Sequence, residues 1–294
     1  MTSQSLATIP VFYRPEIVAE NASRTSPSAA KPAQVIDDWQ RRSLPIELHS
    51  FDPVDRETLA LAHDRDYVEG VLDLTLSNGF GNRLPQVAAS LPFTTGAMLA
   101  AAKEALRNGR VACAPVSGFH HAGYARGGGF CTFNGLMVAA AALRRAGLVR
   151  RVGILDLDHH WGDGTEDIRR RLHLGWIEHH SPGLSAEPAQ AARYLERLPP
   201  IVSGFRDCDL LLYQAGADAH IADPLGGWMT DEQLALRDHI VFEVAATFGL
   251  PVAWNLAGGY QRDASGSISP VLAVHRRTLV ACASVHLGSR WLTP

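Results

Sequence analysis

Short apolar segments alternate with helical patterns along most of this chain, and the alternation limits the folds open to it. The segments that indicate strands are residues 11–13, 110–115, 151–157, 209–214 and 251–256. The segments with helical periodicity are residues 97–107, 136–146, 165–172 and 231–248. This order favours a parallel sheet covered by helices on both faces. Because no internal repeat or linker interrupts the pattern, we expect one α/β domain over residues 1–294.

Polar or glycine-rich residues follow four of the predicted strands directly. These segments are residues 117–121, 156–163, 215–218 and 258–260. Open parallel sheets bind their ligands outside the carboxyl ends of the strands. We therefore expect the four strand ends to converge on one pocket.

The densest of these regions, residues 154–164, runs from an apolar strand into a cluster of acidic and imidazole side chains. Burial of such charges is costly, and a bound divalent cation is the simplest compensation. Asp158 and His160 lie two residues apart and project to the same side of an extended backbone. With Asp218 they form a ligand set that leaves room for water and substrate, as in catalytic metal sites. Zn²⁺ suits this set best, with Fe²⁺ or Mn²⁺ as alternatives. Taken alone, Asp218 could instead cap a helix or a turn.

Two adjacent histidines, His120 and His121, follow another strand end beside a glycine-rich loop. A metal-activated water needs a base with a pKa near neutrality, which imidazole provides. Asp156 and Asp163 are candidates to fix the histidine tautomers. Tyr260, after two glycines, could donate a hydrogen bond to a developing oxyanion. The alternatives are two surface histidines in a flexible loop, a helix cap at Asp163 and a merely packed tyrosine.

The composition is that of a soluble globular protein, with 46% hydrophobic and 19% charged residues. The net charge is −3, and no basic run is longer than the three arginines at 169–171. We therefore expect neither a nucleic acid nor a membrane surface as a partner. The four cysteines have no paired spacing and predict free thiols in a reducing compartment. No signal sequence is apparent, so a cytoplasmic location is expected.

Five motifs in a fixed order resemble those of the histone deacetylase superfamily, which includes bacterial acetylpolyamine amidohydrolases. They are SGFHHA (117–122), GGFCTFNG (128–135), DLDHHWGDGTED (156–167), AGADAHIADPLGG (215–227) and AGGY (257–260). The resemblance implies the arginase/deacetylase fold, with an eight-stranded, mostly parallel sheet and helices on both faces. It also implies Zn²⁺-dependent hydrolysis of an amide bond.

The resemblance further implies three groups of site residues. The metal ligands are Asp158, His160 and Asp218. The catalytic residues are His120, His121, Tyr260, Asp156 and Asp163. The substrate-binding residues are Gly129, Phe130 and Leu225. In the implied mechanism, zinc-activated water attacks an amide carbonyl held by Tyr260, and His121 protonates the departing amine.

The chain departs from the family pattern in three places. Trp161 stands where a second histidine is common, and Gly135 replaces an acidic residue. The segment from His160 to Asp218 is shorter than in the family, and residues 181–183 are the nearest remnant of the loop that forms the opposite tunnel wall. We expect only a local packing change at Trp161, but a pocket that is open on one side or closed by another subunit. Because this segment also supplies the ligands of a structural monovalent cation in the family, the sequence leaves that cation site undecided.

The sequence thus predicts a Zn²⁺-dependent amidohydrolase that removes an acetyl or other acyl group from an acylated lysine or a small acylated amine. Leu225 occupies the position of an acidic residue in polyamine-selective relatives, which argues against strong selection for cationic polyamines. An arginase- or agmatinase-type ureohydrolase is an alternative, but it would need two metals. A non-catalytic acyl- or metal-binding protein is another, and the presence of both His121 and Tyr260 argues against it. Either a monomer or a homo-oligomer fits the sequence.

Overall fold

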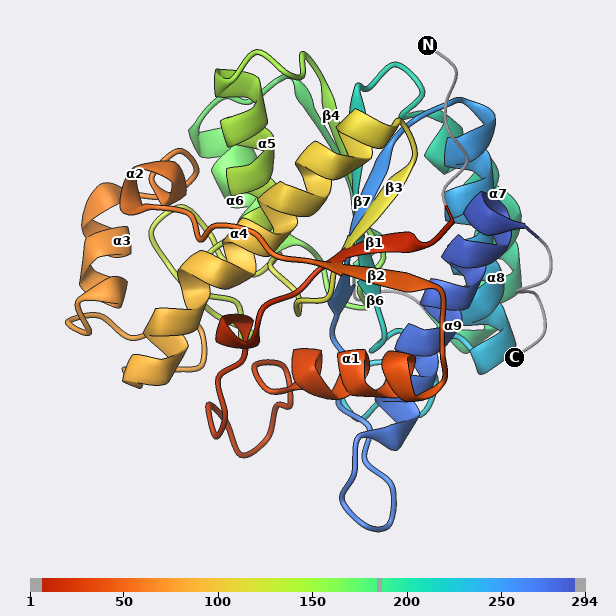
Figure 1. Cartoon of the computed structure of the whole chain (residues 1–294), viewed down its shortest axis with the longest axis horizontal. Helices are drawn as coiled ribbons and strands as arrows, with labels where there is room; N and C mark the ends of the chain where they lie inside the picture. Colours follow the sequence, from red (N-terminus) through yellow and green to blue (C-terminus); the bar gives the residue numbers. More distant parts are fainter. Residues whose placement is uncertain (1–6, 184–186, 289–294) are drawn as a thin grey trace.

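The computed structural model describes residues 7–183 and 187–288, and these build an α/β fold around one sheet (Figure 1). The strands are β1 (Ile9–Phe12), β2 (Ile46–His49), β3 (Val111–Ala114), β4 (Val152–Asp156), β5 (Ile177–His180), β6 (Leu210–Gly216) and β7 (Val252–Ala257). Every neighbouring pair is parallel, and the order across the sheet is β2-β1-β3-β7-β6-β4-β5. The expected parallel sheet is present, although the described residues form seven strands where eight were expected.

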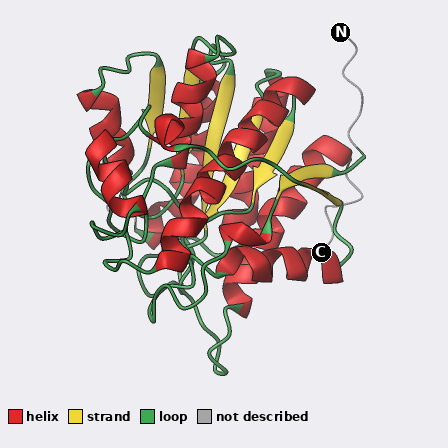
Figure 2. Cartoon of the chain, turned by 60° about the vertical axis from the view of Figure 1, so that its left-hand side comes forward, coloured by secondary structure: helices red, strands yellow, loops and turns green. Residues whose placement is uncertain are grey.

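Helices cover both faces of the sheet, as the alternating pattern predicted (Figure 2). One face packs against α1 (Lys31–Arg41), α7 (Ala191–Ser203), α8 (Asp231–Thr247) and α9 (Ser269–Leu287). The other packs against α4 (Pro85–Asn108), α5 (Gly135–Arg145) and α6 (Asp163–Arg171), with α2 (Arg56–Leu59) and α3 (Arg65–Leu72) beside them. Two short 3-10 helices, η1 (Pro15–Ile17) and η2 (Pro188–Gln190), complete the described elements.

The central strands are apolar on both sides because each side enters a different core. In β3, Val111 and Cys113 pack into the core below α1 and α9, while Ala112 and Ala114 pack into the core below α4 and α5. This alternation follows from the two-residue repeat of an extended backbone. A strand that is buried on both faces therefore has apolar residues at consecutive positions. This continuous apolar segment is the signal from which the central strands were predicted.

Capping side chains mark where two of the predicted helices begin. The Asn134 side chain accepts a hydrogen bond from the Met137 amide at 3.2 Å at the start of α5. Thr230 and Gln233 form a reciprocal capping box at the start of α8. These helices therefore begin within a residue of their predicted positions. In the described part of the chain, no helix combines the length and apolarity needed to cross a membrane.

Candidate active site

The loops after four adjacent strands, β3, β7, β6 and β4, meet at the carboxyl edge of the sheet. They surround a cavity of about 170 Å³. The cavity is lined by Ser28, Ser117, Gly118, His120, His121, Gly129, Phe130, Cys131, Asp158, His160, Leu225, Gly258 and Tyr260. Most of the predicted site residues therefore share one cavity, and the convergence expected from the strand ends is present.

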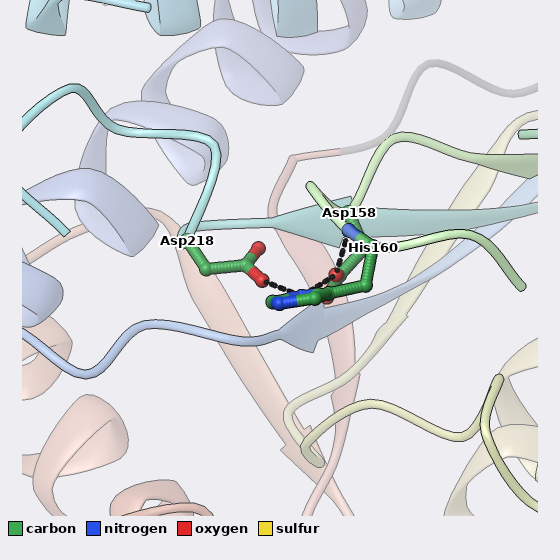
Figure 3. Close-up of side chains that lie close together, drawn as sticks. All are labelled: Asp158, His160 and Asp218. Atoms are coloured by element: carbon green, nitrogen blue, oxygen red, sulfur yellow. Dashed lines mark hydrogen bonds and ion pairs between the residues drawn. The ribbon is translucent and has the colours of Figure 1, made fainter. Parts of the chain in front are cut away.

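Asp158, His160 and Asp218 form the candidate metal cluster (Figure 3). Nδ1 of His160 lies 2.9 Å from Oδ2 of Asp218 and 3.2 Å from Oδ1 of Asp158. One ligand atom from each of the three residues lies within 4.8 Å of the others. Both aspartates are buried, Asp218 completely. The described residues contain one cluster of this kind, which does not supply the two-metal site of a ureohydrolase.

Two glycines let the backbone approach this cluster closely. A Cβ atom on Gly216 would lie 2.3 Å from the Cα of Asp158, and one on Gly258 would lie 2.5 Å from the carboxylate of Asp218. Gly258 also has φ +55°, a left-handed conformation that favours glycine. The first glycine of the AGGY motif is therefore required by the packing of a candidate metal ligand.

The electrostatics of the cluster suit a divalent cation. Burial and the neighbouring carboxylate of Asp158 raise the pKa of Asp218. Hydrogen bonds with Asp158 and Asp218 raise the pKa of His160 to about 10, because a positive charge there compensates the two carboxylates. Two carboxylates and one imidazole are suitable ligands for Zn²⁺ or Fe²⁺, which would supply the same compensation.

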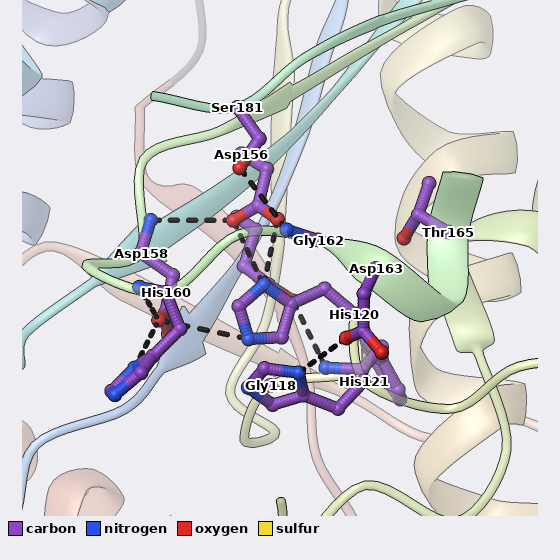
Figure 4. Close-up of polar contacts among 12 residues, drawn as sticks. Gly118, His120, His121, Asp156, Asp158, His160, Gly162, Asp163, Thr165 and Ser181 are labelled. Carbon is purple, nitrogen blue, oxygen red and sulfur yellow. Dashed lines mark hydrogen bonds and ion pairs between the residues drawn. The ribbon is translucent and has the colours of Figure 1, made fainter. Parts of the chain in front are cut away.

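His120 and His121 each bind an aspartate behind them (Figure 4). Nδ1 of His120 lies 2.7 Å from Asp156, and Nδ1 of His121 lies 2.6 Å from Asp163. Asp163 also accepts a hydrogen bond from Arg126 at 2.7 Å and makes no capping hydrogen bond at the start of α6. The aspartates thus bind the Nδ1 atoms and leave the Nε2 atoms for other contacts. Nε2 of His120 lies 3.6 Å from Oδ1 of Asp158 in the candidate metal cluster.

The two histidines differ in their affinity for a proton. Burial alone would lower the pKa of His120, but the carboxylates of Asp156 and Asp158 outweigh it and raise the pKa to about 9. Burial and the adjacent His120 lower the pKa of His121. His120 is therefore suited to hold a proton near neutral pH, while His121 is suited to accept one.

Tyr260 follows the end of β7 and lines the same cavity as the two histidines. Its ring centroid lies 5.7 Å from that of Phe130, which lines the same cavity. Burial and the carboxylates of Asp218 and Asp158 raise the pKa of Tyr260. The phenol therefore stays protonated and can donate a hydrogen bond to a substrate oxygen.

Asp223, which the sequence did not single out as a site residue, holds two cavity residues in place. Its carboxylate accepts hydrogen bonds from the backbone amides of Tyr260 at 2.7 Å and Leu225 at 3.0 Å. Burial raises the pKa of this carboxyl to about 6. In the sequence, Asp223 and the proline after it indicated only a turn. Tyr260, whose backbone amide binds the Asp223 carboxylate, lies 37 residues later in the chain.

The Asp223→Ala variant is expected to lower kcat by roughly 10- to 100-fold, because small displacements of a catalytic group have effects of this size. Metal content should be unchanged, because Asp223 is not part of the metal cluster. Steady-state kinetics on the metal-loaded protein would measure the effect. Asp209→Ala is the matched control, since Asp209 also accepts two backbone amides but at the opposite end of β6. Equal losses in both variants would contradict a role in positioning Tyr260.

Lys31 is a second residue that sequence reasoning missed. Its ammonium donates to the carbonyls of Leu256 at 2.8 Å and Gly258 at 2.5 Å, and so holds the end of β7. Burial lowers the pKa of Lys31 to about 7. No local pattern could have revealed this, because both carbonyls lie more than 200 residues away in the chain.

The departures from the family pattern have visible packing consequences. Trp161 is 40% exposed, and its ring centroid lies 5.7 Å from that of His179. A Cβ on Gly135 would lie 2.6 Å from the Phe119 ring, so no acidic side chain fits there without rearrangement.

The described residues of the shortened segment add nothing to the lining of the cavity. Within the described ranges, nothing between His160 and Leu225 lines it, and residues 184–186 lie outside those ranges. Ser181 instead accepts a hydrogen bond from the Gly162 amide at 3.2 Å. After His160, the next described residue along the chain that lines the cavity is Leu225. The opening on one side that the shortening led us to expect stays a prediction.

A candidate metal cluster, two His–Asp pairs and a protonated tyrosine around one cavity are the components of a hydrolase that acts on amide bonds. The profile of the histone deacetylase domain matches residues 26–180 and 179–274. The chain therefore belongs to the histone deacetylase family and is a hydrolytic deacetylase.

Individual proteins are similar to this chain in sequence, and one solved structure is similar to it in fold. An uncharacterized protein of Picosynechococcus sp. is 32% identical over 263 residues, which cover 79% of this chain and 85% of that protein. A probable deacetylase of Methanothermobacter thermautotrophicus is 33% identical over 201 residues, covering 58% and 59%. The crystal structure of the HDA15 HD domain shares the fold with a TM-score of 0.74 at 17% identity, and covers 98% of this chain and 97% of that one.

Proposed function

We propose that the chain is a Zn²⁺-dependent amidohydrolase that removes an acetyl or other acyl group from an acylated lysine or a small acylated amine. The observation that carries this proposal is the shared cavity, where His121 and Tyr260 both adjoin the candidate metal cluster. The cluster suits Zn²⁺ best, with Fe²⁺ as the alternative. A divalent ion held there would acidify a water molecule and polarise the amide carbonyl.

The side chains of the cavity divide the remaining work. Tyr260 donates a hydrogen bond to the carbonyl oxygen as negative charge develops on it. His121 takes a proton from the attacking water and delivers it to the amine when the C–N bond breaks. His120 stays protonated beside it and stabilises negative charge. Asp156 and Asp163 hold the two rings through their Nδ1 atoms.

The cavity lining favours a neutral acyl-lysine side chain over a polycation. Among the lining residues, Asp158 is the one carboxylate, and it belongs to the candidate metal cluster. The rim residue Leu225 is 47% exposed and offers only apolar contact. Acetylspermidine is therefore expected to be a poorer substrate than an acetyl-lysine peptide.

The test is hydrolysis of an acetyl-lysine peptide by the zinc-loaded protein and by its Tyr260→Phe variant. Loss of one donor to a developing oxyanion should lower kcat by roughly 100-fold. Zinc content by elemental analysis should stay at one ion per chain, because the cluster is intact. A binding protein would show no turnover in either form, and a ureohydrolase would need two ions. Tyr124→Phe is the control, because Tyr124 does not line the cavity.

A further inference from the structure

The two aspartates behind the active-site histidines are held in different ways (Figure 4). Asp156 is fully buried, and its Oδ1 accepts a hydrogen bond from the side chain of Gln214 on β6 at 2.9 Å. Asp163 begins α6, and its side chain is 40% exposed. Its Oδ1 binds His121, and in the described part of the chain the group that binds its Oδ2 is the guanidinium of Arg126, at 2.7 Å.

Arg126 contacts both members of the pair formed by His121 and Asp163. One of its terminal nitrogens donates to the Asp163 carboxylate, and the other donates to the backbone carbonyl of His121 at 3.4 Å. The nitrogens of a guanidinium point in fixed directions, so this group holds the carboxylate and the carbonyl in a fixed relation. The imidazole ring of His121 lies between these two attachments, which limits its movement.

Resting on the proposed function, we infer that Arg126 is a positioning residue of the hydrolysis, which acts through Asp163 to keep the His121 ring in the orientation that proton transfer requires. Arg126 does not line the active-site cavity, so its effect on the reaction passes through this pair. Gln214 holds Asp156 behind the other histidine, from a strand of the core.

The loop that carries Arg126, residues 123–129, also packs against the His121 ring. A tight turn begins this loop, closed by a hydrogen bond from the Gly123 amide to the Arg126 carbonyl at 2.9 Å. At its other end, a Cβ on Gly129 would lie 2.3 Å from Cδ2 of His121, so the backbone lies directly against the ring. By binding Asp163, Arg126 fixes to α6 the same loop that contacts the ring.

The ion pair of Arg126 and Asp163 is exposed, which separates positioning from stability. The side chains are 50% and 40% exposed, respectively. Water screens pairs as exposed as this one, so they contribute little to the stability of a fold. A small displacement of a catalytic group, by contrast, can lower the rate by roughly 100-fold. Loss of Arg126 should therefore reduce catalysis far more than stability.

The experiment measures kcat and KM for an acetyl-lysine peptide with the zinc-loaded full chain. Arg126→Ala should lower kcat by roughly 10- to 100-fold and leave KM within about twofold. Arg126→Lys should recover part of kcat, because an ammonium can bind Asp163 but cannot reproduce both directions of the guanidinium. Arg171→Ala is the control for the loop, since the guanidinium carbon of Arg171 lies 4.6 Å from the ring centroid of Tyr124 in the same loop.

A double-mutant cycle tests whether Arg126 acts through the carboxylate. In the Asp163→Asn background, Arg126→Ala should change kcat by less than about twofold, because its charged partner is already absent. The zinc content and the midpoint of thermal unfolding of Arg126→Ala should match those of the wild type.

A wild-type kcat in Arg126→Ala, a change in KM alone, or the same loss of kcat in the Asp163→Asn background would overturn the inference. An equal loss in Arg171→Ala would also overturn it, because order in the loop would then explain the effect. Each of these outcomes leaves the proposed function standing, since the wild type still hydrolyses the peptide. Absence of hydrolysis by the wild type would instead overturn the proposed function, and the inference with it.

Discussion

Replacement of Asp218 by asparagine is expected to abolish zinc binding and to lower kcat/KM by about 10³-fold or more, because a catalytic metal contributes several kcal/mol to transition-state stabilisation. The metal-free variant should nevertheless remain folded. Asp218 is fully buried beside Asp158, and both burial and that neighbour raise its pKa. A neutral amide of the same shape removes the repulsion between the two carboxylates.

Thermal and urea unfolding with and without zinc would separate the two effects. Zinc at about 100 times its Kd should stabilise the wild type by about 2.7 kcal/mol and the variant by nothing. Asp37→Asn is the control, because Asp37 is exposed and pairs only with Arg41 at 2.7 Å. Zinc stabilisation of Asp218→Asn equal to that of the wild type would contradict the assignment of the cluster.

The central strands could be predicted because both of their faces are buried. β4 and β7 contain apolar residues at almost every position, and all their residues are buried. The two strands at the edges of the sheet, β2 and β5, have the sequences IELH and IEHH. Each of these edge strands has exposed or half-buried positions that carry polar residues. Because neither strand forms a continuous apolar segment, the sequence pattern did not predict them. The expected helix at 97–107 is also the second half of the longer helix α4, whose first half contains Pro92.

The site could be located because parallel strands place consecutive polar loops at one edge. Asp158 and Asp218 each follow a strand by two residues, and adjacency of β4 and β6 in the sheet brings them together. Asp223 and Lys31, by contrast, act on backbone groups that are distant in the chain. Such contacts depend on the assembled tertiary structure, and single-sequence patterns carry no signal for them.

Loss of the buried guanidinium of Arg237 is expected to cost the fold about 3–5 kcal/mol, the usual effect of removing one partner of a buried ion pair. Arg237 on α8 binds Asp238 at 2.8 Å, and both side chains are 1% exposed. One of its nitrogens also donates to the carbonyls of Leu157 at 3.0 Å and Gly216 at 2.8 Å. Leu157 directly follows β4, and Gly216 is the last residue of β6. The candidate metal ligands Asp158 and Asp218 come one and two residues later in the chain.

The Arg237→Met variant would leave the Asp238 carboxylate without its cation and both carbonyls without a donor. Urea unfolding should therefore show a free energy of unfolding that is lower than that of the wild type by about 3–5 kcal/mol. Zinc affinity should fall by roughly 10- to 100-fold, the usual effect of losing support behind metal ligands. The double variant Arg237→Met, Asp238→Asn should recover part of the stability, because no buried charge remains and Thr278 keeps an acceptor oxygen.

Arg276→Met provides the matched control on the same face of the sheet. Arg276 also pairs with an aspartate, Asp38, at 3.0 Å, but its side chain is 24% exposed. Solvent weakens such a pair, so its loss should cost at most about 1 kcal/mol and should leave zinc affinity unchanged. Losses of equal size in Arg276→Met and Arg237→Met would show that the Arg237 guanidinium contributes no more than an ordinary ion pair. An unchanged zinc affinity in Arg237→Met would show that the ends of β4 and β6 hold the ligands without it.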